Sequence, residues 1–595
     1  MLYIIENKYY LCHCVVNLIL LLMEEKIYPK TINGKVYYYL QRTYREKIDT
    51  NIIGTTKGSG KSKVKTKSTY LGTASSIRGR LINIKEPLDV KYKEFGLVGA
   101  VYNVAEEIGM VEILKKNIKG TRYGIDNWIY FLLAIINRID NSTSKEKMGN
   151  WATGTILPDI LNFNPSKLNS KSFWYASDDV ISEKKLQDKR EEKPEIKKDV
   201  LTGIEERVLK KIEKEIIKNI KNKYDLSSNI FLYDTTNFFT FFQEPTRSLL
   251  ARSAKSKAGR NNLKHIGLAL SVDQQWGIPL FHSVYRANSH DTKTFYEIIT
   301  DLTNVLKTEF YGVENAVLII DKGNNSKDNF EKLNGNIEWV GSLKISDYRD
   351  LTDLPLSNYD NIYKDFKYFQ TQKEVMGVEL KLVVTYNEKL YRKQLHSLEN
   401  GIDRLEEKIK NKWSEYKRPQ KKVPKGLKNI LSQSYYKDYV TIRCKKGKLI
   451  FLKQQENIDK KKSKFGKTIL FGSNLKKESS TIIEQYHSKD KVEDGFKLLK
   501  DPHIISWSPM RHWTDSKIQT FAFCNVIALM LIRIMEYKAA TNNIKMSPYV
   551  LKQELKDLKT VILIYDEKTA VTKITHRSTV QKQLWDIFKL DTLKK

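Results

Sequence analysis

Residues 486–500 read YHSKDKVEDGFKLLK and combine an apolar stripe with a polar one. The polar residues recur at spacings of three, four and seven: Tyr486, Lys489, Glu493 and Lys500. The apolar residues beside them are Val492, Phe496 and Leu499. Because an α-helix has about 3.6 residues per turn, this spacing predicts one helix with both stripes on adjoining faces. One edge would pack on a core, and the other would present a carboxylate, two cations and a phenol, which suits holding a metal ion against a phosphate.

Upstream of this helix, the pattern from about residue 228 predicts strand, strand, strand, helix and strand. Two apolar runs, NIFLYDTT and AVLIIDKGN, end in Asp234 and Asp321 and form the first and last of these strands. Fully apolar runs are typical of central strands, and the exit from such a strand is a common place for catalytic groups. A single acid there is commonly a turn or helix cap. Two such acids followed by a helix-borne Glu493 are far more specific.

Three carboxylates from two strand ends and a helix can hold two divalent ions roughly 3.5–4 Å apart. Hard oxygen ligands favour Mg²⁺, with Mn²⁺ as a substitute. Such a site can activate water to nick DNA, and the freed 3′ hydroxyl can attack a second phosphodiester. Asp234, Asp321 and Glu493 are therefore the predicted metal ligands and catalytic residues.

The spacing of the 486–500 stretch resembles the Y-(2)-R-(3)-E-(6)-K signature of the insertion-sequence-4 superfamily of DDE transposases, with Lys489 in place of the usual Arg. The resemblance extends over roughly residues 228–535 and includes the YDTTNFF, NSHD and IIDKGNNS blocks. A looser similarity to insertion-sequence-1634-like transposases reaches the N-terminal region. It implies an α/β fold, in which an RNase H-like catalytic core is interrupted by a β-rich insertion.

The resemblance also implies roles for further residues. Tyr486, Lys489 and Lys500 are expected to contact DNA phosphates, although lysine lacks the bidentate fork of arginine. The basic segment that holds Lys257 and Arg260 is either a DNA backbone contact or a solvated loop. Supporting roles are open for three more residues: His290, Asp291 and Trp413. Relatives stack a Trp of the insertion on a flipped base, and for Trp339 a core position is the preferred interpretation.

Composition agrees with a DNA partner without requiring one. The 595 residues contain 103 Lys and Arg against 70 Asp and Glu, a net charge of +33. Such a charge indicates a polyanionic partner or, equally, a lysine-rich surface that is merely solvated. Nucleotide binding is not expected, because Gly54 precedes Gly60 by six residues and so breaks the P-loop spacing.

The chain ends and cysteines bear on location. Four cysteines without CxxC pairs indicate neither a zinc module nor a disulfide framework, so a reducing cytoplasm is expected, with nucleoid association on DNA. Residues 9–22 form an apolar run that is short for a membrane span, and a mis-called start before Met23 is the preferred explanation over a leader. The run 521–535 contains Asn525 and Arg533 and favours a buried helix.

Seven segments are predicted along the chain. Residues 1–22 are the doubtful leader; 23–90 form a small β-rich module; 91–227 form a helical region, which could bind DNA, with a charged, solvated connecting helix. Residues 228–330 and 481–540 form the two parts of the catalytic core. Residues 331–480 form an inserted β-rich domain with a helical arm, and 541–595 form a basic tail.

The resulting hypothesis is a transposase that binds terminal inverted repeats and target DNA and cuts and joins them as a homodimer. Two alternatives stay open. One is an inactive DNA-binding remnant of such an element, and the other is an RNase H-like nuclease without joining activity.

Overall fold

A computed structural model describes residues 25–47, 62–82, 87–184, 188, 191, 207–224, 226, 229–242, 248–254, 262–309, 316–416, 418, 420–565 and 569–593. The fold is mixed α/β and divides into two compact units. One unit contains Met1–Lys91 with Val561–Lys573, and the other contains Tyr92–Thr560 with Ile574–Lys595. Residues 1–22, the doubtful leader or mis-called start, lie outside the described residues.

The first unit is built around an antiparallel sheet of order β1-β2-β3. Its elements are β1 (Glu25–Ile32), β2 (Lys35–Lys47), β3 (Ser62–Gly72) and helix α2 (Ala74–Ile82). Residues 62–68, which are rich in lysine, belong to strand β3 because they pair with β2. Stacked tyrosines cover one face of this sheet, including Tyr28 and Tyr39 with ring centroids 5.8 Å apart.

The second unit begins with a helical region after strand β4 (Asp89–Glu94). Its elements are α3 (Gly96–Glu107), α4 (Met110–Asn117), β5 (Thr121–Arg122), β6 (Ile125–Asp126), α5 (Asn127–Asp140), η1 (Lys145–Lys147), α6 (Met148–Thr153), α7 (Leu157–Leu161), η2 (Pro165–Lys167), α8 (Ser170–Asp178) and α11 (Arg207–Lys223). Helix α11 is not the solvated connector predicted from its charge. Its apolar stripe, which includes Ile212, Ile216 and Ile220, is fully buried against the neighbouring elements.

A large sheet forms the centre of this unit, with strand order β10-β9-β7-β11-β12-β18-β15-β14-β13. Its first six strands in chain order and their helices are β7 (Ile230–Phe239), β8 (Arg252–Ser253), which pairs only with β9, β9 (Lys264–Asp273), β10 (Pro279–Arg286), α12 (Asp291–Glu309), β11 (Val317–Ile319), η3 (Lys322–Asn324), α13 (Lys327–Leu333) and β12 (Glu338–Leu343). Strand β7 is antiparallel to β9 and parallel to β11, and β12 is parallel to β11. The predicted order of strand, strand, strand, helix and strand is thus observed.

The first half of the predicted insertion continues the central sheet. It contains η4 (Ile345–Asp347), α14 (Arg349–Thr352), η5 (Leu356–Asn358), β13 (Asn361–Tyr363), β14 (Phe366–Val375) and β15 (Val378–Asn387), and the chain returns through β18 (Lys467–Gly472). Strand β18 pairs with β12 on one side and β15 on the other. The sequence predicts an inserted β-rich domain here. In the structure the inserted strands extend the central sheet, because β18 joins them to the core strands by hydrogen bonds.

Residues 388–466 form an arm with a hydrophobic core of its own. Its elements are α15 (Glu388–Ser414), α16 (Lys425–Gln433), η6 (Lys437–Tyr439), β16 (Val440–Lys445), β17 (Lys448–Lys453) and α17 (Gln455–Lys462). The predicted helical arm is α15, whose Leu398, Ile402, Leu405 and Ile409 are buried. Gly401, which weakens the helix prediction, lies under the ring of Tyr436, where a Cβ would be 2.0 Å from that ring. The glycine is therefore explained by packing.

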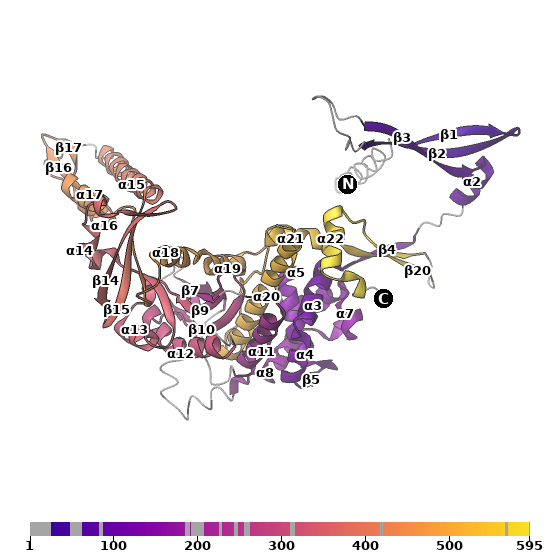
Figure 1. The fold of residues 1–595 in the computed structure, drawn as a ribbon, viewed down its shortest axis with the longest axis horizontal. Coiled ribbons are helices and arrows are strands. Elements are labelled where there is room, and N and C mark those ends of the chain that lie inside the picture. Colours follow the sequence, from indigo (N-terminus) through magenta and orange to yellow (C-terminus); the bar gives the residue numbers. More distant parts are fainter. Residues whose placement is uncertain are drawn as a thin grey trace. The chain divides into compact units, whose positions relative to one another are not determined.

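After the arm, two short helices precede the longest apolar helix. They are α18 (Ser479–His487) and α19 (Asp490–Lys500), followed by α20 (Asp515–Thr541). In Figure 1, α18 and α19 lie along one side of the central sheet, and α12 and α13 lie along the other. In the described part of the chain, α20 alone is long and apolar enough to cross a bilayer, but it is almost entirely buried within the protein. The prediction of a buried helix over 521–535 is confirmed.

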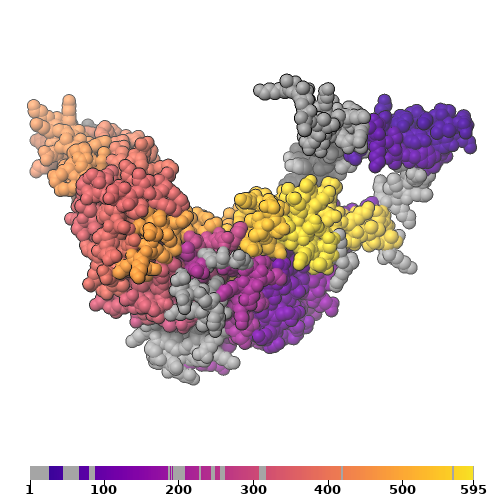
Figure 2. All heavy atoms as spheres, in the orientation of Figure 1, coloured from indigo at the N-terminus to yellow at the C-terminus, as the bar shows by residue number. Residues whose placement is uncertain are grey.

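The residues predicted as a basic tail fold into helices and strands, and those of the second unit, 548–560 and 574–593, pack on its helices. They form α21 (Pro548–Lys556), β19 (Lys559–Ile564), β20 (Ala570–Ile574), α22 (Thr579–Ile587) and η7 (Leu590–Leu593). Trp585 is 1% exposed and stacks on Phe95, with ring centroids 5.3 Å apart. Figure 2 shows these yellow atoms against the purple atoms of the helical region. The segment was predicted as a tail because its high lysine content makes the apolar residues at helical spacing hard to recognise in the sequence.

Gly96 fixes this contact and gives a stability prediction. Its N–H donates to the Leu558 carbonyl at 2.7 Å, and an added Cβ would lie 2.3 Å from the Leu555 carbonyl oxygen. Since backbone cannot move aside as a side chain can, we expect Gly96→Ala to lower the free energy of unfolding by about 2–3 kcal/mol. Gly154→Ala is the control, because its Cβ would come no closer than 3.4 Å to its neighbours. Equal denaturation midpoints for the two variants would contradict the expectation.

Candidate functional site

The sequence pattern predicts Asp234 at the end of a strand. In the structure it lies in the middle of β7. Strand β7 continues to Phe239 because it remains paired with β9 along that whole length. On its other side, the pairing with β11 stops at Leu232. Asp234 is therefore the second residue beyond the last β11 pair, and its side chain is largely buried.

Asp321 comes to the same level of the sheet. Ile319 is the last paired residue of β11 and lies opposite Leu232 of the parallel strand β7. Asp321 lies two residues after Ile319, and Asp234 lies two residues after Leu232. Neighbouring strands lie about 4.8 Å apart. The topology thus brings together the two aspartates that the sequence predicts, although 87 positions separate them.

The 486–500 stretch is two helices and not one. Helix α18 ends at His487 and α19 begins at Asp490. Over the intervening turn the hydrogen bonds change from i−4 to i−3, since the N–H groups of Lys489 and Val492 donate to Tyr486 and Lys489. Such a tighter turn rotates each residue further than an α-helix does. Helix α19 then packs over β7 and β9, with Gly495 next to Leu270, the residue paired with Asp234.

Lys489 is the cation that the two aspartates face in this structure. Its Nζ lies 3.2 Å from Asp321 Oδ1, and its side chain is only 13% exposed. Burial lowers the pKa of Lys489, but Asp234 and Asp321 outweigh it and leave that pKa raised. Burial raises the pKa of Asp234, Lys489 opposes the rise, and Asp321 and Glu493 add to it. The charges of Asp321 and Glu493 therefore act on the carboxyl of Asp234.

Tyr486 and Lys500 reach the same region from the two helices. The Tyr486 hydroxyl donates to Ser342 Oγ on β12 at 2.8 Å. Lys500 Nζ donates to Thr236 Oγ1 on β7 at 2.7 Å and lies 5.1 Å from the centroid of the Phe238 ring. Neither Ser342 nor Thr236 was predicted from the sequence. Thr236 could have been found, since residues two apart on a strand share a face with Asp234, whereas no sequence signal points to Ser342.

The donor set can be compared with the needs of a divalent metal ion. Three carboxylates match the hard oxygen ligands that Mg²⁺ prefers. In the described part of the chain, however, no three Asp, Glu, His or Cys side chains are gathered closely enough to form a metal cluster. Glu493 is solvent-exposed and Asp321 is paired with Lys489. The chemistry of the donors fits a metal ion, and the Lys489 ammonium supplies the positive charge beside them.

Asp291 lies beside this group, and His290 has no contact with it among the described side chains. The Thr235 hydroxyl donates to Asp291 Oδ1 at 3.5 Å. A Cβ at Gly323, two residues after Asp321, would lie 3.4 Å from Asp291 Oδ2. Asp291 also opens helix α12, so the position combines a helix start with proximity to the acids. The supporting roles of Asp291 and His290 stay predictions.

The remaining predicted residues are Lys257, Arg260, Trp413 and Trp339. Lys257 and Arg260 lie outside the described residues. Trp413 ends α15 and packs, partly buried, in the core of the arm beside Tyr416. Trp339 is 1% exposed within β12, which confirms its interpretation as a core residue. The base-stacking role of Trp413 stays a prediction.

Comparison with known proteins gives little further information. No protein-family model matches the chain. No curated protein matches it either. Among solved structures, the chain is similar to the piggyBac transposase in a cryo-EM synaptic complex with hairpin DNA, with 10% identity, a TM-score of 0.37 and 80% of each chain covered. A likeness at this level assigns neither a family nor an activity.

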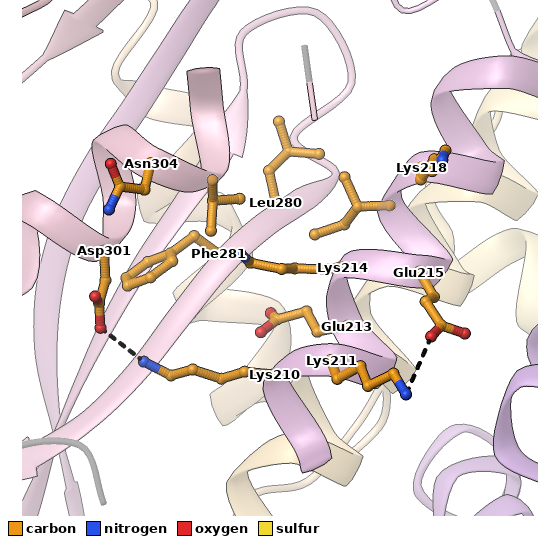
Figure 3. Close-up of a pocket in the computed structure, with 12 residues that line it drawn as sticks. Lys210, Lys211, Glu213, Lys214, Glu215, Lys218, Leu280, Phe281, Asp301 and Asn304 are labelled. Carbon is orange, nitrogen blue, oxygen red and sulfur yellow. Dashed lines mark hydrogen bonds and ion pairs between the residues drawn. The ribbon is translucent and has the colours of Figure 1, made fainter. Parts of the chain in front are cut away.

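A separate basic groove of about 540 Å³ lies between α11, β10 and α12 (Figure 3). Lys210 crosses it to Asp301 at 3.3 Å, and Lys211 faces Glu215 at 3.9 Å. Glu213 and His282 form a buried pair, with 2.7 Å between Oε1 and Nδ1. None of the predicted catalytic residues lines this groove.

Proposed function

We propose that this protein is a DNA transposase of the DDE type, which binds terminal inverted repeats and cuts and joins DNA. The observation that carries the proposal is the convergence of Asp234, Asp321 and α19 at one edge of the central sheet. The 486–500 stretch brings Lys489 to Asp321 and Lys500 to Thr236 at that same edge. Acids and cations from distant parts of the sequence are thereby arranged for a phosphodiester substrate.

An RNase H-like core is part of the proposal. It is supported by the order of β7, β9, β10, α12 and β11 and by the strand directions, with the third acid on a later helix. We assign the core to the insertion-sequence-4 superfamily on its signature residues. The sheet-forming insertion between β12 and β18 is consistent with that assignment.

Asp234, Asp321 and Glu493 would hold two Mg²⁺ ions, with Mn²⁺ as a substitute. The ions would supply Lewis-acid stabilisation of charge on the phosphodiester oxygens. Hydrolysis of one phosphodiester leaves a 3′ hydroxyl. Attack of that hydroxyl on a target phosphodiester forms the new bond and releases a target 3′ hydroxyl, so the number of phosphodiester bonds is conserved in joining.

The protein's own cations would position the DNA. Lys489, held beside the acids, would face the scissile phosphate, and Lys500 and Tyr486 would contact phosphates on either side of it. Each contact with a phosphate contributes affinity that falls with salt. We further propose that two protomers pair the transposon ends, that Lys257 and Arg260 contact the DNA backbone, and that the protein acts in the cytoplasm at the nucleoid.

The decisive experiment uses the purified full chain and labelled DNA that flanks its own gene. We expect end cleavage and strand transfer with Mg²⁺ and neither with EDTA. Asp321→Asn is expected to lose both reactions, whereas Asp328→Asn, an exposed change on α13, keeps them.

The possible outcomes separate the competing functions. Cleavage without joining would replace the proposal with a nuclease. Tight DNA binding with neither reaction would replace it with an inactive remnant. Metal-dependent reactions that survive in Asp321→Asn would show that the acids are wrongly assigned.

A further inference from the structure

A small cavity of about 70 Å³ lies between α5, α8, η1 and the start of α20, all within the second unit. Its walls combine aromatic rings, which include Phe173 and Phe521, with cations. The four basic side chains that line it are Arg138, Lys145, His512 and Lys517. None of the residues of the proposed catalytic site lines this cavity.

Two of these cations lack a negative partner in the part of the chain that the structure describes. Arg138 is 8% exposed, and its Nη1 donates only to neutral groups, the Ser142 hydroxyl at 2.7 Å and the Ser506 carbonyl at 3.1 Å. Lys145 Nζ lies 4.8 Å from the centroid of the Phe173 ring, with no ion pair. Lys517, in contrast, is paired with Asp178.

Burying a charge without a counterion costs free energy. That cost lowers the pKa of three basic groups in the cavity, Arg138, Lys145 and His512. Burial lowers the pKa of Arg138 to about 10. Burial, followed by the like charge of Arg138, lowers the pKa of Lys145 to about 7. Burial, together with Lys145, Arg138 and Lys517, lowers the pKa of His512 to about 3. The neutral His512 ring therefore adds no further positive charge, and burial raises the pKa of Cys524 to about 11, so its thiol supplies no negative charge either.

We propose that this cavity binds a phosphate group between the Arg138 guanidinium and the Lys145 ammonium. A planar guanidinium and an ammonium are the side chains that bind phosphate most strongly in proteins. The cavity exceeds the roughly 10–15 Å³ that one water needs but is far below the roughly 300 Å³ of a drug-sized site. A single tetrahedral oxyanion suits that size.

The rim of the cavity indicates how the group enters. Lys145, Ser170 and Trp174 are partly or fully exposed, whereas Arg138 lies further inside. A phosphate would pass Lys145 first and reach Arg138 last. The group could belong to inorganic phosphate or to a DNA backbone, and the experiment distinguishes these two sources.

The test measures binding of inorganic phosphate to the full chain by calorimetry, with chloride holding the ionic strength constant. We expect saturable binding of one phosphate per chain. Lys145→Gln should weaken phosphate binding by at least about tenfold, since it removes one of the two positive side chains that are proposed to contact the phosphate. Lys147→Gln is the matched control, because Lys147 lies on the same short helix η1 but is exposed and outside the cavity. This variant should bind within about twofold of wild type.

A chemical readout supports the assignment independently. At neutral pH an amine with a pKa near 7 is acetylated faster than an ordinary lysine, because more of it is uncharged. Mass spectrometry should find Lys145 acetylated before Lys147, and phosphate should protect Lys145 alone. Equal weakening by both glutamine variants, the absence of saturable phosphate binding, or protection of neither lysine would each overturn the proposal.

Short duplex DNA identifies the source. If the site takes a backbone phosphate, Lys145→Gln lowers duplex affinity and reduces the salt slope by about one, and inorganic phosphate competes with the duplex. If it takes the free anion, the variant loses phosphate binding while duplex affinity stays unchanged. These assays need neither Mg²⁺ nor cleavage, so their failure is distinct from failure of the proposed transposase activity.

Discussion

Glu493→Gln is expected to lower end cleavage by about 10³-fold or more, because the substitution removes the charge of a carboxylate that is proposed to bind metal. The substitution keeps the size of the side chain, and Glu493 is solvent-exposed, so the fold should persist. Binding to labelled end DNA should stay within a few fold of wild type. Single-turnover cleavage of that DNA in Mg²⁺ measures the effect on the chemical step.

The neighbouring residue supplies a matched control. Asp494 is a half-exposed acid on the same helix turn and pairs with Lys497 at 2.8 Å. Asp494→Asn removes the same charge one residue away, and we expect less than about threefold loss of cleavage, as for an exposed ion pair. If both variants lost activity equally, general charge on α19 and not a specific ligand would explain the result.

Asp515→Ala is expected to lower the free energy of unfolding by about 3–5 kcal/mol, because it strips a buried carboxylate from the donors that surround it. Asp515 is 0% exposed at the start of α20. It accepts hydrogen bonds from the Ser248 hydroxyl and from the N–H groups of Leu249 and Leu250. Removing it leaves these buried donors without an acceptor. Urea unfolding followed by tryptophan fluorescence measures the loss.

The control for this prediction separates charge from hydrogen bonding. Asp515→Asn retains an acceptor oxygen and should cost less than Asp515→Ala. Asp494→Asn, at a half-exposed position, should change stability by less than about 0.5 kcal/mol. An alanine variant as stable as wild type would show that water satisfies the 248–250 turn and that Asp515 does not hold it.

The part of the fold predicted from sequence is the part with strong periodicity. Apolar runs identified β7 and β11, and the acids that follow those runs identified Asp234 and Asp321. The spacing of 486–500 identified α19 but not the break at Lys489, because both helices share the same apolar stripe across that turn. The end of β7 was also missed, since pairing with β9 prolongs a strand whose local sequence reads as its end.

Features that depend on distant partners were beyond the sequence. The tail prediction for 541–595 was overturned by Trp585 and its contact with Phe95, nearly 500 positions away. The lack of a negative partner for Arg138 among the described residues was equally hidden, because a neutral partner such as Ser506 leaves no charge pattern in the sequence. For the candidate site, the three acids were predicted from the sequence. The contacts of Lys500 and Tyr486 could not be predicted, because they depend on how the strands assemble into the sheet.

Because the chain returns through β18, the arm joins the sheet at a single place, between β15 and β18. Strands β15 and β18 are antiparallel neighbours, and the N–H of Asn387 donates to the Gly466 carbonyl at 2.8 Å. The two ends of the 388–466 excursion therefore meet at one hydrogen-bonded rung, as the strands of a hairpin do. A two-residue turn could replace the whole arm without disturbing the register of the sheet. Evolution can accordingly lengthen, exchange or remove this arm while the acids keep their positions.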